Sequence, residues 1–322
     1  MSAFLERPYT TLAVVLIRYG FAAMIHGHAH AELDDVRYSY INKLQSREQD
    51  DPRRLISRES ESGRFLLPLA YAETDEAIVT FAGPAMILRS NAFMVSPCYA
   101  LTEYHSVFGR QRDPKKLHTM QLWFGAGELD NGFRYKLSAR PVGTHIQASA
   151  GARGVVLMQL EKCVGKKIGW MSISIPGRAR MVGRNVKMAA YNPEFPKRYI
   201  PYQDKCQIKA LDNLSAMQMH DCVSRPGSSS GMIFETIKND NRVLAINFGG
   251  TKQRDGFHPY SHEYANLAVP LDMLCQTPYM LKVIFDDIEA FAGPNPASSL
   301  KYEDGVLARE RVAKECETVL PT

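Results

Sequence analysis

Between residues 76 and 275 the chain alternates between short apolar runs and turn-forming residues. Each run has the length of a β-strand, and glycine, proline, asparagine and aspartate are common in between. The eight clearest runs are Ala77–Phe81, Ala92–Val95, Gln121–Phe124, Val155–Leu160, Met171–Ile175, Val186–Ala190, Met232–Glu235 and Val243–Phe248. Regularly spaced short strands of this kind predict an all-β fold, either a sandwich or barrels.

Composition excludes several classes of protein. The chain has 322 residues, 45% hydrophobic and 23% charged, which is typical of a globular protein and not of a disordered, collagenous or coiled-coil chain. Its net charge is only +5, from 39 basic and 34 acidic residues, without a run of five lysines and arginines. We therefore expect no nucleic-acid partner. No stretch of 18 apolar residues occurs, so we expect no membrane span.

The first 31 residues have the order of features typical of a secretory signal peptide. Arg7 precedes an apolar run, Thr10–Ile17, and Ala29-His30-Ala31 offers small residues at a cleavage site. Arg18 interrupts the run, so a mis-called start codon or a buried N-terminal helix are alternatives. We expect a secreted or periplasmic protein.

The next segment, residues 32–75, is a charged N-terminal segment or pro-segment. Its stretch Glu32–Ser62 has eight acidic and six basic residues, which leaves little apolar surface to bury. Near the other end, apolar residues at helical spacing between Pro270 and Phe291, interrupted near Pro278, predict a helix over 276–293. Residues 294–322 form a tail with a short helix over Tyr302–Leu320.

Two segments carry candidate chemistry. His105 follows an apolar run in A-L-T-E-Y-H-S-V-F (100–108) and is a candidate general base. The segment H-D-C-V-S-R-P-G-S-S-S-G-M-I-F (220–234) places a Gly-Ser turn before a strand. A glycine before a nucleophile lets backbone N–H groups turn towards a developing oxyanion. Taken alone, each has a plain alternative: a structural histidine and a flexible Ser/Gly loop.

Together, these segments resemble the histidine and serine motifs of chymotrypsin-fold (trypsin-like) serine peptidases, in particular the bacterial trypsin-like/glutamyl-endopeptidase branch. Segments 155–171, 189–195, 204–206, 244–250 and 264–271 agree with that branch in the same order, so the resemblance covers about residues 76–290. It implies two six-stranded antiparallel β-barrels, over 76–165 and 166–275, followed by the C-terminal helix.

The resemblance also implies roles. Ser229 would be the nucleophile, His105 its general base, and Gly227 and Ser229 would supply the oxyanion-hole N–H groups. Moving the alignment by one residue makes Ser230 the nucleophile but puts Ser228 at the oxyanion glycine. Neither a cofactor nor a metal is required, and the partner is a polypeptide.

The third member of the triad departs from the family. Gly154 stands where the acid is expected, and Asn131–Leu160 contains no aspartate or glutamate. The acids nearest in sequence are Glu128, Asp130 and Glu161. In well-studied triads, loss of the acid slows turnover by roughly 10⁴-fold. Two hypotheses follow: a serine endopeptidase, or a catalytically degenerate pseudo-peptidase that binds peptides or a partner protein. An esterase-like activity is a weaker third.

The expected specificity pocket comprises Asn247, Gly249 and Gly250. Asn247 stands where glutamyl endopeptidases carry a histidine, and an amide carries no charge, so a preference for glutamate is not supported. An ordinary strand residue is an equal alternative for Asn247. Val223 stands where trypsins carry an acid. The sequence therefore leaves the substrate preference open.

The six cysteines form no C-x-x-C pair, which argues against a zinc ribbon. The resemblance implies a Cys206–Cys222 disulfide. Closing a loop of that size contributes about 3 kcal/mol in the entropy model. In the cytosol the two would instead be reduced core thiols. Cys98, Cys163, Cys275 and Cys316 have no deducible pairing.

Overall fold

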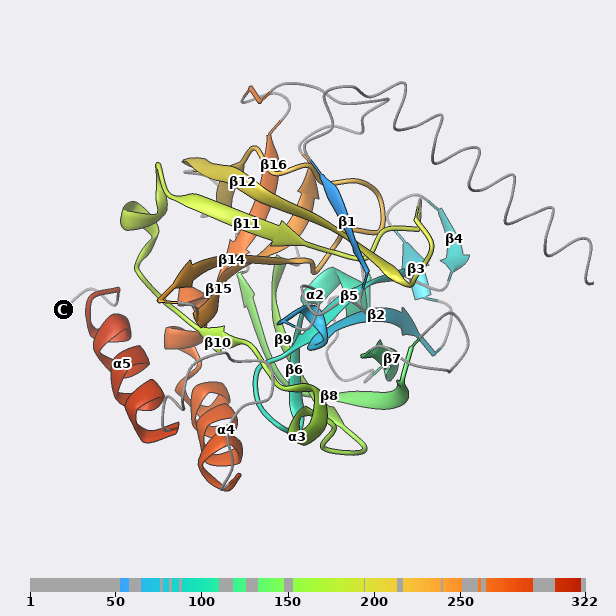
Figure 1. Cartoon of the computed structure of the whole chain (residues 1–322), viewed down its shortest axis with the longest axis horizontal. Helices are drawn as coiled ribbons and strands as arrows, with labels where there is room; N and C mark the ends of the chain where they lie inside the picture. Colours follow the sequence, from blue (N-terminus) through green and yellow to red (C-terminus); the bar gives the residue numbers. More distant parts are fainter. Residues whose placement is uncertain are drawn as a thin grey trace, which may run out of the picture. The chain divides into compact units, whose positions relative to one another are not determined.

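The computed structural model of the chain describes most of the region after residue 52 (Figure 1). The described residues are 53–57, 65–75, 78–80, 83–86, 89–109, 118–125, 133–147, 153–193, 195–212, 217–238, 240–250, 260–261, 265–291 and 305–319. The signal peptide expected over 1–31 lies outside them. None of the helices in these ranges has the length and hydropathy of a transmembrane segment.

Six antiparallel strands close the first barrel in the order β2-β5-β6-β9-β8-β7. Their bounds are β2 Leu69–Thr74, β5 Arg89–Met94, β6 Tyr99–Glu103, β7 Met120–Phe124, β8 Tyr135–Gln147 and β9 Arg153–Leu160. A separate hairpin, β3 Ile78–Thr80 and β4 Gly83–Met86, lies between β2 and β5 in sequence. The short helices α2 Tyr104–Phe108 and α3 Gly165–Ile168 follow β6 and β9.

The second barrel closes in the order β12-β11-β14-β15-β16-β13, because β13 pairs back to β12. Its strands are β11 Asn185–Ala189, β12 Tyr199–Asp212, β13 Met217–His220, β14 Met232–Ile237, β15 Asp240–Gly250 and β16 Asn266–Pro270. Two further strands pair with strands of this barrel: β1 Arg54–Ser57 is antiparallel to β12, and β10 Ser172–Ile173 runs parallel to β15. A 3-10 turn, η4 Arg178–Met181, precedes β11.

Apolar side chains fill both barrels and a third layer outside them. In β9, Val156 and Met158 point into the first barrel, whereas Val155 and Leu157 belong to the outer layer. Strand β14 alternates in the same way, with Ile233 in the second barrel. Because such strands are apolar on both faces, they read in the sequence as continuous hydrophobic runs.

The predicted fold class is confirmed: the chain forms two closed six-stranded antiparallel barrels and a C-terminal helix. The boundaries differ from the expected ones. The first barrel begins at Leu69, before the expected residue 76, and the charged segment 32–75 also supplies β1 to the second barrel. The expected ranges missed β1 because it has only four residues and lies in a polar stretch. They missed β2 because the first barrel was counted only from residue 76.

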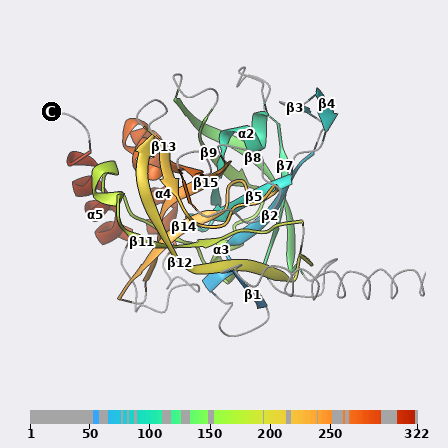
Figure 2. The same cartoon turned by 90° about the horizontal axis from the view of Figure 1, so that it is seen from above.

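The C-terminal region forms two helices that lie beside each other (Figures 1 and 2). The 3-10 turn η5 Leu271–Gln276 precedes α4 Pro278–Glu289, and α5 spans Gly305–Glu317. The predicted interruption at Pro278 is the start of α4, where the missing proline N–H costs no helical hydrogen bond. Arg309 of α5 bonds to Asp286 and Glu289 of α4.

All six cysteines are paired, and the Cys206–Cys222 disulfide implied by the resemblance is present. Cys98–Cys163 joins two turns of the first barrel, and Cys275–Cys316 joins η5 to α5. The Cα atoms of the three pairs are 4.0–5.4 Å apart, below the separation of about 7 Å beyond which two cysteines cannot be bridged without backbone movement. Three disulfides fit an oxidising compartment such as the exterior of a cell.

The two barrel disulfides provide a graded test of stability. We expect Cys206→Ser/Cys222→Ser to lower the unfolding free energy by about 3 kcal/mol and Cys98→Ser/Cys163→Ser by about 4 kcal/mol. The order follows from the sequence separations of 16 and 65, since the longer loop is restricted more by its crosslink. Guanidinium unfolding of both variants measures the two losses. A reversed order would contradict the loop-entropy explanation.

Candidate active site

A sharp turn at the end of β6 positions His105. The strand ends at Glu103, whose extended backbone caps α2 and whose carboxylate accepts a 2.7 Å hydrogen bond from the His105 N–H. Tyr104 beside it is fully buried, so the turn is anchored in the first barrel. The His105 side chain remains 24% exposed.

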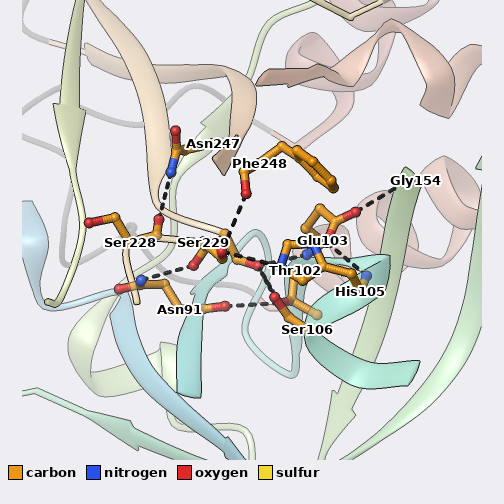
Figure 3. Close-up of polar contacts among 11 residues, drawn as sticks. Asn91, Thr102, Glu103, His105, Ser106, Gly154, Ser228, Ser229, Asn247 and Phe248 are labelled. Atoms are coloured by element: carbon orange, nitrogen blue, oxygen red, sulfur yellow. Dashed lines mark hydrogen bonds and ion pairs between the residues drawn. The ribbon is translucent and has the colours of Figure 1, made fainter. Parts of the chain in front are cut away.

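His105 faces Ser229, which comes from the second barrel (Figure 3). The His105 Nε2 atom is 3.2 Å from Ser229 Oγ. The same hydroxyl lies 3.3 Å from the carbonyl oxygen of Phe248, so it has two acceptors in reach. The Phe248 ring packs edge-on against the imidazole, with centroids 4.9 Å apart. The Ser229 hydroxyl can therefore release its proton to a ring whose position is held from the second barrel.

The carboxylate that contacts the other imidazole nitrogen belongs to Glu103. Its Oε2 atom lies against His105 Nδ1, and its Oε1 atom accepts a 3.4 Å hydrogen bond from the Gly154 N–H. The Glu103 side chain is fully buried. A buried carboxylate is costly unless it is paired and hydrogen-bonded, and Glu103 is both.

The sequence analysis did not identify Glu103 as a candidate for the acid of the triad. Among the three acids it considered, Glu128 and Asp130 lie outside the described residues, and Glu161 is engaged with the Ser138 N–H at the surface. Glu103 stands two positions before His105 in the motif itself. That proximity was the available signal, but residue type alone does not reveal that the side chain turns inward to the imidazole. Gly154 contacts the same carboxylate, because its backbone N–H donates to Glu103 Oε1.

The serine loop over residues 224–231 is shaped around Gly227. This residue has φ +90°, and an added Cβ would lie 2.4 Å from Pro193 Cδ. Only glycine fits both constraints without strain. Within the described part of the chain, neither the Gly227 N–H nor the Ser229 N–H donates a hydrogen bond. Neither N–H is therefore occupied by an acceptor from the described residues, and both are available to an external one.

Ser230, the alternative nucleophile, is fully buried, and its hydroxyl contacts residues on either side of His105 and not the imidazole. Its hydroxyl accepts a 3.0 Å hydrogen bond from the Glu103 N–H and contacts the hydroxyls of Thr102 and Ser106 at 3.0 and 2.9 Å. It also has a left-handed backbone conformation, with φ +62°, which is uncommon for a residue other than glycine. The geometry thus connects Ser229, and not Ser230, to the imidazole.

The expected specificity residues lie on β15. Asn247 is fully buried, with its amide directed into the serine loop. Gly249 and Gly250 end the strand, and an added Cβ at Gly249 would have no neighbour within 4 Å. Val223 is also buried and donates its N–H to Gln203.

One cluster has the composition of a metal site: Cys206, Asp221 and Cys222 have potential ligand atoms within 4.8 Å of one another. The two sulfur atoms are joined to each other in a disulfide, so they do not offer thiolates to an ion.

Two six-stranded barrels, with a histidine turn from the first facing a serine loop from the second, define a chymotrypsin-like serine peptidase fold. No family model matches the chain, and no curated protein matches it in sequence. A solved Glu endopeptidase in complex with MPD is 12% identical, with 71% of this chain and 98% of that one covered and a TM-score of 0.44. A thermostable serine protease AL20 from an extremophilic microorganism is 14% identical, with 68% and 98% covered and a TM-score of 0.47. These similarities do not bear on activity.

The close approach at Gly227 can be tested against a matched glycine. Gly183 has a similar φ of +84° but open space where a Cβ would lie. We expect Gly183→Ala to lower the unfolding free energy by about 1–2 kcal/mol, the cost of the left-handed backbone. Gly227→Ala should lose more, because the methyl group also meets Pro193. Denaturant unfolding of both variants measures the difference, and Pro193→Ala should reduce it. Equal losses would show that the contact does not matter.

Proposed function

We propose that this protein is a serine endopeptidase in which Ser229 is the nucleophile, His105 the general base and Glu103 the acid of the triad. The observation that carries the proposal is the line of contacts from Ser229 Oγ to His105 Nε2 and from His105 Nδ1 to Glu103. With the carboxylate at Nδ1, that nitrogen carries the proton. The lone pair of Nε2 is then free to accept another from serine.

Acylation follows from this geometry. Ser229 Oγ attacks the carbonyl carbon of the peptide bond while its proton passes to His105 Nε2. The carbonyl oxygen becomes an oxyanion, which the N–H groups of Gly227 and Ser229 stabilise. The C–N bond then breaks, and the imidazolium gives its proton to the leaving amine. Throughout, the buried Glu103 carboxylate stabilises the positive imidazolium.

Deacylation uses the same groups. His105 Nε2 removes a proton from a water molecule, whose oxygen attacks the ester carbon of the acyl-enzyme. The second oxyanion forms in the same place, and its collapse releases the acid product. Ser229 Oγ takes the proton back from the imidazolium, so the starting state is restored.

The pseudo-peptidase hypothesis was based on Gly154, which stands where the acid of the triad is expected. Glu103 supplies a carboxylate to the same imidazole and bonds the N–H of Gly154, so that support is removed. Export of the enzyme by an N-terminal signal peptide is part of this proposal. The three disulfides support it, because a reducing cytosol disfavours them.

Active-site labelling tests the nucleophile. We expect a fluorophosphonate probe to label the wild-type chain and Ser230→Ala, and not to label Ser229→Ala, because only the Ser229 hydroxyl faces the imidazole. Gel fluorescence of the folded chains, free of residues 1–31, measures labelling. Loss of labelling in Ser230→Ala alone would move the nucleophile by one residue. A folded wild-type chain that no probe labels at any pH would favour the pseudo-peptidase.

The acid is tested by Glu103→Gln, which keeps the shape of the side chain and removes its charge. We expect kcat to fall by about 10³–10⁴-fold, because the amide no longer stabilises the imidazolium or selects its tautomer. The control is Glu161→Gln. Glu161 is a surface glutamate whose carboxylate also accepts a hydrogen bond from a backbone N–H, that of Ser138. Peptide hydrolysis by both variants, with circular dichroism to verify folding, makes the comparison. Similar rates in the two variants would exclude Glu103 from the triad.

A further inference from the structure

Asn247 makes contacts that a specificity residue does not need. It lies on β15 and is fully buried. Its Nδ2 group donates to the carbonyl oxygen of Ser228 at 2.8 Å and to Ser224 Oγ at 2.9 Å. Figure 3 shows the first of these bonds, directed from the strand onto the residue before Ser229. The side chain thus holds the loop that carries the proposed nucleophile.

The orientation of this amide follows from its surroundings. The Ser228 carbonyl is an acceptor only, so the Asn247 atom facing it must be the NH₂ group. Within the described residues the other amide atom, Oδ1, is buried without a hydrogen-bond donor. A buried polar atom without a partner is costly, and an apolar residue would avoid that cost. The presence of an amide despite this cost points to a task for the NH₂ group.

The task follows from peptide geometry. In a trans peptide the C=O of one residue and the N–H of the next point in opposite directions, and the described chain has no cis peptide. Asn247 Nδ2 and the Gly231 N–H both hold the Ser228 carbonyl, the latter at 3.0 Å. The N–H of Ser229 must then point away from these two groups. That N–H is one of the two proposed oxyanion donors.

We propose that Asn247 is a positioning residue that fixes the Ser228–Ser229 peptide, so that the Ser229 N–H faces the developing oxyanion. This role rests on the proposed peptidase function and replaces the expected role in substrate specificity. The backbone of Asn247 also bonds the loop, through Ser230 N at 2.7 Å and Gly231 O at 2.8 Å. Those bonds do not involve the side chain, so a substitution can loosen one peptide while the loop stays attached.

The test compares Asn247→Leu with Asn266→Leu. Asn266 is a matched control: it is a buried asparagine of the neighbouring strand, its Nδ2 donates to the Cys222 carbonyl at 2.5 Å, and its Oδ1 likewise has no partner among the described residues. We expect Asn247→Leu to lower kcat by about 10–100-fold with little change in KM, because one oxyanion donor is worth about 10²–10³-fold when fully removed. Asn266→Leu should keep kcat within about threefold.

Three readouts separate positioning from a merely structural or specificity role. Peptide substrates differing in the residue before the cleaved bond should all lose the same factor in kcat. A peptide boronate forms a tetrahedral adduct with serine that mimics the oxyanion intermediate, and the affinity for it should fall by that factor. The affinity for a product peptide should not change. Thermal unfolding should show similar losses of stability in the two leucine variants. If Asn247→Leu does not fold, Asn247→Ala is measured in the same way.

The outcomes are distinct. A loss confined to one class of substrate residue would overturn the proposal in favour of a specificity role. Unchanged kcat and boronate affinity in a folded Asn247 variant beside an active wild type would overturn only this inference. A folded wild-type chain that neither cleaves peptides nor binds the boronate would overturn the proposed function, and this inference with it.

Discussion

Hydrogen bonds that cross between the two barrels determine where every part of the candidate site lies. The main group of these bonds is made by Asn91, a fully buried residue of β5 in the first barrel. Its side-chain amide faces the carbonyl oxygens of Tyr191, Gly227 and Ser229 at 2.9–3.2 Å, and its N–H donates to the Ser229 carbonyl. Its own carbonyl accepts from Thr102, just before the histidine turn. Because unpaired groups at such depth are costly, these bonds form together and hold both halves of the site in one arrangement.

Glu103 makes two kinds of contact with one side chain. Its carboxylate caps the short helix that carries His105, and the same carboxylate meets the imidazole ring. The cap places negative charge where the helix presents free N–H groups, which helps to offset the cost of burial. The neighbouring strand β9 then needs to supply only a backbone N–H, and Gly154 does so.

Much of the fold could be predicted from the sequence because strands such as β9 and β14 are buried on both faces and read as apolar runs. The long strands β8 and β12 were missed, since polar residues recur along them and the alternation is irregular. At the site, the resemblance of the segments around His105 and Ser229 to peptidase motifs predicted that these two residues meet, and their side chains are in contact. The roles of Glu103 and Asn247 depend on which way a buried side chain turns, and packing decides that.

The acid and the base of the proposed triad lie two residues apart, at the end of one strand. Their contact is therefore local, and a rigid-body shift of one barrel against the other leaves it intact. Within the proposed triad, such a shift alters a single spacing, that between the imidazole and Ser229. Of the two contacts that make up the proposed triad, only the one between His105 and Ser229 crosses the barrel junction. Any loosening of the barrel junction should separate the nucleophile from an acid–base pair that remains assembled.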